Sequence, residues 1–101
     1  MKATTARQKA IRDAMRRLVP DAPYADASRI FEDAIRRHLR HMAPHDAVIL
    51  TATGVARHEH TEYDALLAEG QDRDAARFLV ADDTDDVLER WGATFRVGRN
   101  G

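Results

Sequence analysis

The spacing of apolar residues near the start of the chain predicts an α-helix. Between Ala6 and Val19, apolar side chains recur at steps of three and four residues, namely Ile11, Ala14, Met15 and Leu18. Steps of this kind gather side chains on one face of a helix. Neither Pro20 nor Pro23 can donate a backbone hydrogen bond, so we expect the helix to end before them.

A second amphipathic helix is expected from Asp26, as its N-cap, to about Met42. Its apolar stripe has the same spacing and consists of Ile30, Phe31, Ala34, Ile35, Leu39 and Met42. Glu32 and Asp33 are each followed four residues later by an arginine, and such pairs stabilise the exposed side of a helix.

The segment after Pro44 is compatible with either a helix or a strand. Proline suits the first turn of a helix. The β-branched residues between Val48 and Val55 suit a strand, and Gly54 disfavours a helix. We predict a helix, because there is no second strand and a lone strand leaves backbone polar groups unpaired. Gly54 is then interpreted as a small residue that lets another helix approach closely.

Two further helices are expected in the second half of the chain. Thr61 and Asp64 have the spacing of a capping box for a short helix that ends at Gly70. Asp72 is expected to cap a last helix, which ends at Gly92. Its apolar residues are Ala76, Leu79, Val80, Val87, Leu88 and Trp91. The acidic run 82–86 either bends this helix or restarts it, and the sequence leaves both open.

The pattern as a whole predicts an all-α fold, a compact single-domain bundle of about four to five helices, one of them short. The chain has 101 residues, which is enough for one domain with one modest hydrophobic core. We expect residues 1–92 to form the helical domain and residues 93–101 to form a flexible or weakly ordered, frayed tail.

The composition removes several classes of function. Without cysteine there is no disulfide framework and no thiol nucleophile. The chain has no Gly-x-Ser-x-Gly motif and no glycine-rich phosphate loop, and Ser28 is its single serine. These absences disfavour an enzyme, and no cofactor is indicated. The longest strongly apolar run, 47–50, is too short to cross a membrane, so we expect a cytoplasmic protein without membrane contact.

Five histidines raise the question of a metal ion. His38 and His41 are three residues apart, and His58 and His60 flank Glu59, but no HExxH motif is present. The acidic run 82–86 lacks the glycine and the terminal glutamate of an EF-hand loop. No metal site is therefore predicted.

The net charge of −1 conceals an uneven distribution. Residues 1–45 carry a net charge of +5, and residues 46–101 carry −6. A candidate basic surface within the first half consists of Arg36, Arg37, Arg40 and His41, and it is suited to phosphate contacts with a nucleic acid. Few aromatic residues are left for base stacking, which argues against that alternative. The sequence leaves open whether the two halves neutralise each other or form separate surfaces.

A second candidate site lies between residues 57 and 77. Its members are Arg57, His58, Tyr63, Asp64, Arg73 and Arg77. Arg73 and Arg77 are four residues apart and share a helix face, so the group is a candidate anion or phosphate site. The alternative is a structural role, because caps and local ion pairs account for most of these residues.

The same segment resembles a family of proteins. Its motif, from Arg57 to Arg77, reads RHxxTxYDxLLxxGxxRxxAR and is followed by Trp91–Gly92. It resembles a small bacterial domain family of unknown function with this signature. The resemblance implies a compact helical domain and implies no activity, substrate or catalytic residue.

Taken together, these features predict a non-enzymatic interaction module that binds a protein partner. One alternative is nucleic-acid binding through the basic first half. The other is a small phosphate-handling or hydrolytic enzyme that uses Arg57, His58, Arg73 and Arg77.

Overall fold

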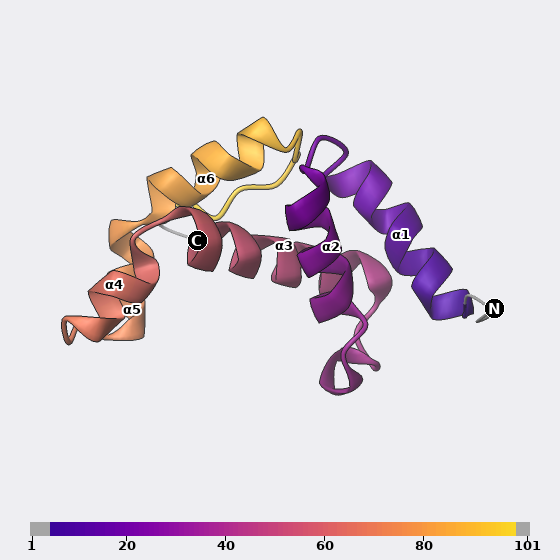
Figure 1. Cartoon of the computed structure of the whole chain (residues 1–101), viewed down its shortest axis with the longest axis horizontal. Helices are drawn as coiled ribbons and strands as arrows, with labels where there is room; N and C mark the ends of the chain where they lie inside the picture. Colours follow the sequence, from indigo (N-terminus) through magenta and orange to yellow (C-terminus); the bar gives the residue numbers. More distant parts are fainter. Residues whose placement is uncertain (1–4, 99–101) are drawn as a thin grey trace.

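The computed structural model describes residues 5–98, and within that range it contains six α-helices, one 3-10 turn and no strand (Figure 1). The elements are α1 (Ala6–Leu18), α2 (Tyr24–Ala34), η1 (Arg37–Leu39), α3 (Pro44–His60), α4 (Tyr63–Ala68), α5 (Arg73–Leu79) and α6 (Ala81–Arg90). The all-α prediction is confirmed. Residues 1–4 of the expected domain and 99–101 of the expected tail lie outside the described range.

The central helix is α3, against which α1, α2 and α6 pack (Figure 1). Its buried residues are small or β-branched, namely Ala47, Val48, Thr51, Ala52, Val55 and Ala56. Such short side chains let three helices approach one central helix closely. The prediction of a helix rather than a strand is confirmed, with Pro44 in its first turn. The interpretation of Gly54 is wrong, because a Cβ added there would meet no atom of a neighbouring element within 4 Å.

The main hydrophobic core lies between these four helices. Its largest fully buried side chains are Ile11 of α1, Ile30 of α2, Val48 of α3, and Thr84 and Leu88 of α6. The hydroxyl of Thr84 donates to the Val80 carbonyl at 2.7 Å, which satisfies the one polar group among them. The core therefore joins both halves of the chain through α3.

The second helix differs from its prediction at both ends. The structure places its N-cap at Pro23 and Asp26 within the first turn. The helix ends at Ala34, and residues 35–42 form a loop that contains η1. Leu39 nevertheless faces the core, because a 3-10 turn also returns a side chain to one face every three residues.

A long-range contact favours the end of α2 at Ala34 rather than at Met42. The Arg7 guanidinium of α1 donates to the Leu39 carbonyl at 2.8 Å, and the Met42 N–H donates to the same oxygen at 2.9 Å. In a helix that continued to Met42, the Leu39 carbonyl would instead point along the helix axis.

The last predicted helix is two helices, so the acidic run lies in a restarted helix. Asp72 caps α5 as expected, since its side chain accepts a hydrogen bond from the Ala75 N–H at 2.7 Å. Val80 is both the C-cap of α5 and the N-cap of α6. Asp82 and Asp83 lie in the first turn of α6, where negative charge is favourable.

Two glycines end helices as the sequence predicts. Gly70 follows α4 with φ +100°, and Gly92 follows α6 with φ +74°. The two hydrogen bonds of a Schellman motif close each helix: after α6, the Gly92 N–H donates to Glu89 and the Ala93 N–H to Leu88. The neighbouring Trp91 carbonyl accepts from the Asp21 N–H at 3.0 Å, which fastens the end of α6 to the loop between α1 and α2.

Residues 93–98, where we expected a frayed tail, have neither helix nor strand. They nevertheless contact the body: Ala93 is buried, and Phe95 and Val97 pack partly against the core. The Asp85 carboxylate accepts hydrogen bonds from the N–H groups of Val97 at 2.6 Å and Gly98 at 3.0 Å. A carboxylate on α6 therefore holds the described part of this segment.

We predict that Asp85→Ala speeds the hydrogen exchange of the Val97 and Gly98 amides by about tenfold or more, since a hydrogen bond to a charged group contributes about 1.5–3 kcal/mol. The matched control is Asp86→Ala, because Asp86 is exposed and has no such role. Exchange measured by NMR checks this prediction, and equal rates in both variants would contradict it.

The molecule is elongated, with extents of 45 × 25 × 23 Å. The helices α1 and α2 lie toward one end of the long axis, and the hairpin of α4 and α5 lies at the other (Figure 1). This hairpin has a small apolar cluster of its own, formed by Tyr63, Ala76 and Val80 with Leu66 and Leu67 packed against it. Among the described residues, no helix is long and apolar enough to span a membrane.

Candidate functional site

The sharp turn between α3 and α4 positions the first residues of the predicted anion site. Thr61 makes this turn: its hydroxyl donates to the Arg57 carbonyl at 2.5 Å and accepts from the Tyr63 N–H at 3.2 Å. The expected capping box is wrong: the N-cap of α4 is Glu62 rather than Thr61, and the Asp64 carboxylate contacts His58 instead of reaching back to Thr61. The turn thereby brings the end of α3 beside the start of α4.

Four of the six predicted residues meet at this turn. His58 Nδ1 lies 2.6 Å from Asp64 Oδ1. The His58 ring meets the Tyr63 ring edge-on, with centroids 5.0 Å apart and an angle of 78°. The Arg57 guanidinium lies 5.5 Å from the centroid of the same ring. Tyr63 is 3% exposed, so a ring fixed in the hairpin cluster orients both neighbours.

The electrostatics of Arg57 set it apart from the other cations. Its Nε atom is inaccessible to solvent and has no hydrogen-bond partner among the described residues. Burial lowers the pKa of Arg57 below its ordinary value, the positive charge of Arg77 lowers it further, and Tyr63 acts in the opposite direction. Arg77 is thus near enough for its charge to act on Arg57.

Arg73 is not among the residues whose side chains contact one another at this turn. It is the first residue of α5 and is exposed, like Arg77 one turn later. Neither arginine forms a salt bridge with Asp64 or Asp74 within residues 5–98, so the structural alternative of local ion pairs does not apply to them. Contacts bring together Arg57, His58, Tyr63 and Asp64, whereas Arg77 acts on Arg57 through its charge and Arg73 is placed only by its position on α5.

The pair of His58 and Asp64 has the geometry of an oriented imidazole. Their side chains are 52% and 63% exposed, however, and catalytic pairs are usually enclosed where water is excluded. The single serine, Ser28, lies on α2 and not at this turn. The geometry therefore shows an oriented imidazole that is open to solvent.

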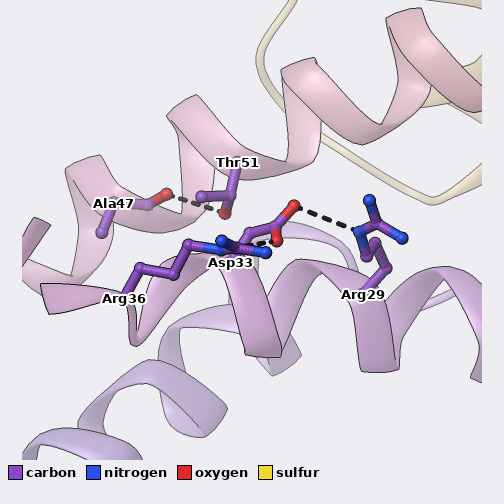
Figure 2. A network of polar contacts seen from close by, with 5 residues as sticks. All are labelled: Arg29, Asp33, Arg36, Ala47 and Thr51. Carbon is purple, nitrogen blue, oxygen red and sulfur yellow. Dashed lines mark hydrogen bonds and ion pairs between the residues drawn. The ribbon is translucent and has the colours of Figure 1, made fainter. Parts of the chain in front are cut away.

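The residues of the candidate basic surface lie in a loop around η1 rather than in the predicted helix. Arg36, Arg37, Arg40 and His41 are all exposed in or beside η1. Arg36 Nε lies 3.1 Å from Asp33, whose carboxylate also contacts Arg29 at 3.5 Å, as Figure 2 shows beside Thr51 of α3. Asp33 therefore offsets part of the positive charge that the sequence assigns to this surface.

No group of three or more histidine, aspartate or glutamate side chains in residues 5–98 is arranged to hold a metal ion. His60 contacts Asp26 at 2.8 Å and meets the Trp91 ring edge-on, so it ties α3 to α2 and α6. His58 and His60 thus have separate partners.

A groove between α1 and α2 was missed in the sequence analysis. It encloses about 390 Å³. Its apolar lining is Met15, Val19, Pro20, Ala22, Ala27 and Phe31, and its polar lining is Arg12, Arg16, Ser28 and Glu32. Tyr24 stands at the edge and is 87% exposed. The available signal was Tyr24 itself, a large aromatic residue directly after Pro23 and outside the apolar stripe of α2.

A second groove of about 380 Å³ lies between α2, η1 and α3. Gly54 lines it, which explains why a side chain there would meet nothing. Arg29, Asp33 and Arg36 occupy one wall, and His58 and Glu59 lie on the other helix. Within this lining, Arg29 and Arg36 both pair with Asp33.

Comparison with known proteins places the chain in a family. Residues 14–92 match the family described as "Uncharacterized conserved protein (DUF2293)". The chain belongs to this family. The match extends from within α1 to Gly92 and so includes the whole segment from Arg57 to Arg77, while the family description names no activity. No curated protein and no solved structure matches the chain significantly.

Proposed function

We propose that this member of the family is a protein-interaction module whose groove between α1 and α2 binds an acidic, amphipathic segment of a partner protein. The observation that carries the proposal is an apolar groove with an almost fully exposed Tyr24 at its edge and two arginines in its lining. Tyrosine, arginine and methionine are enriched where proteins bind one another.

The shape of the groove suits a polypeptide segment. Tyr24 is 87% exposed, so the edge does not close over the cavity as it does around an enclosed small molecule. The Arg12 guanidinium lies 4.0 Å from the centroid of the Phe31 ring and forms part of the floor. An arginine held in this way loses little side-chain freedom on binding.

Charge favours an acidic partner. Arg12 and Arg16 line the groove, and Lys9 and Arg17 are exposed elsewhere on α1. Arg16 contacts Asp13 at 2.8 Å, but this pair is exposed, and such pairs contribute only about 0.2–1 kcal/mol, so exchange for a partner's carboxylate costs little. Glu32 is the one carboxylate in the lining and provides a contact for a basic residue at one end of the segment.

A selection from a library of short random peptides tests the proposal. We expect the selected peptides to be rich in Asp or Glu and in large apolar residues. Tyr24→Ala is expected to weaken their binding by at least about tenfold, because buried interface tyrosines commonly contribute 2 kcal/mol or more. The exposure of Tyr24 makes this variant safe for the fold.

Leu79→Ala is the matched control, since Leu79 is 55% exposed on α5, away from the groove. Selection of basic peptides, or equal binding by Tyr24→Ala, would overturn the proposal. A single-stranded oligonucleotide forms a parallel arm. If it binds instead and shifts the amide signals of Arg37 and Arg40, nucleic-acid binding replaces the protein partner.

A further inference from the structure

The corner between α5 and α6 presents an apolar patch at the surface. Phe78 and Leu79 are adjacent in the last turn of α5 and are 50% and 55% exposed. Single apolar side chains on a surface are common, whereas neighbouring ones that stay exposed are typical of interaction sites. Four large apolar side chains are exposed in residues 5–98, and three of them are this pair and Tyr24 at the edge of the groove.

The chain around this patch has opposite charges on its two sides. Residues 72–86 contain six aspartates and two arginines, which gives a net charge of −4. Arg73 and Arg77 precede the patch on α5, and Asp82 and Asp83 follow it in the first turn of α6. The corner is therefore acidic and amphipathic, with basic residues toward one end, and this is the chemistry that the proposed function assigns to the occupant of the groove.

The groove between α1 and α2 has the complementary charge. The helix α1 contains five cations and one carboxylate, which gives a net charge of +4. On α2, Asp26 contacts His60 and Asp33 contacts two arginines, so these carboxylates already have partners within the chain. Glu32 lines the groove and offers a contact to the arginines of α5. Charge therefore favours the corner as the occupant of the groove.

One copy of the chain cannot fill its own groove. The groove lies toward one end of a molecule that is 45 Å long, and the hairpin of α4 and α5 lies at the other end (Figure 1). The apolar cluster of Tyr63, Ala76 and Val80 holds α5 in this hairpin. The corner and the groove can therefore meet only between two copies.

We infer that the partner of the groove is a second copy of this chain, whose corner docks with Phe78 and Leu79 against Tyr24 and the apolar lining. The inference rests on the proposed function, because it uses the same groove. The aspartates at the start of α6 then face the arginines of α1. Such a contact joins two different surfaces, so repetition of it produces a ring or an open chain of copies.

Sedimentation velocity of the full chain, from about 1 μM to about 1 mM, tests the inference. We expect the mean mass to rise above that of the monomer as the concentration increases. Added sodium chloride should weaken this association, because it screens the attraction between the acidic corner and the basic helix α1.

Two variants show which surfaces meet. Tyr24→Ala in the groove and Leu79→Ala in the corner are each expected to weaken self-association about tenfold, as the loss of a large interface side chain does. Their mixture is decisive: the Leu79→Ala copy keeps the groove and the Tyr24→Ala copy keeps the corner, so together they form a heterodimer more tightly than either associates alone. Leu50→Ala is the matched control, since Leu50 is 52% exposed on α3, and it should associate as the wild type does.

Binding of the selected acidic peptides separates this inference from the proposed function. At protein concentrations below those of self-association, Leu79→Ala should bind the peptides as the wild type does, because its groove is intact. A chain that stays monomeric at every concentration overturns the inference, and peptide binding in that case still supports the groove with a different partner. A mixture of the two variants that associates no better than each variant alone also overturns the inference.

Discussion

Replacing Leu88 with alanine is expected to lower the free energy of unfolding by about 3–4 kcal/mol, because removal of a buried leucine loses its transfer energy and leaves a cavity. Leu88 is 0% exposed and lies where α6 meets the central helix α3. Domains of this size are stable by only about 5–15 kcal/mol, so the loss is a large share of the total. Urea unfolding followed by circular dichroism measures it.

Leu50→Ala provides the same chemical change at an exposed position. Leu50 is 52% exposed on α3, so we expect a loss within about 0.5 kcal/mol. If both variants lose the same amount, the packing of α6 on α3 is wrong. The single tryptophan, Trp91, is buried at the end of α6, so its fluorescence reports whether α6 detaches separately.

The sequence predicts the helices well where the apolar stripe and the cap agree. For α1 and α3 the three- and four-residue steps are confirmed, and Asp72, Gly70 and Gly92 have the expected roles. The sequence-based prediction fails at residues 35–42, because Leu39 is also buried, and Ile35 and Met42 also pack against the core, from a loop with a 3-10 turn. The deciding contact, between Arg7 and the Leu39 carbonyl, joins residues 32 positions apart and cannot be read locally.

For the candidate sites, too, the sequence predicts residues that lie close together in the chain better than contacts between distant segments. Arg57, His58, Tyr63 and Asp64 lie within eight consecutive residues, so one turn brings them together and the sequence finds them. The proximity of Arg77 depends on how α5 packs on Tyr63, and the sequence suggested it only through helical spacing. The groove between α1 and α2 was missed, because it is formed by the packing of two helices rather than by any motif.

The opposite charges of the two halves are only partly separated along the long axis of the molecule. The helices α1 and α2 of the basic half lie toward one end, and α4 and α5 of the acidic half lie at the other (Figure 1). The pairs at Asp13 and Asp33 are local contacts within the basic half. The acidic run 82–86 lies on α6, whose end is fastened to the loop between α1 and α2, so the basic and acidic halves also meet there.

Replacing Gly92 with alanine is the second large change that we expect, with a loss of about 2–3 kcal/mol in the free energy of unfolding. A side chain at positive φ costs roughly 1–2 kcal/mol, and φ is +74° here. The added Cβ would also lie 2.6 Å from Asp21 Oδ2 and 3.1 Å from Pro20 Cγ, distances at which neighbouring atoms must move. That movement strains the hydrogen bond from the Asp21 N–H to the Trp91 carbonyl. Thermal and urea unfolding measure the loss.

Two further variants separate the contributions of conformation and contact. Gly70→Ala meets no atom within 4 Å, so at φ +100° it should carry only the conformational cost of roughly 1–2 kcal/mol. In the Gly92→Ala background, Asp21→Ala removes the closest contact and should restore a small part of the loss, while the contact with the Pro20 ring remains. Equal losses in Gly92→Ala and Gly70→Ala would contradict the close approach of the α1–α2 loop to the end of α6. The close approach of this loop fastens α6 to α1 and α2. If the loop moves away, we also expect the Trp91 ring to become exposed to solvent.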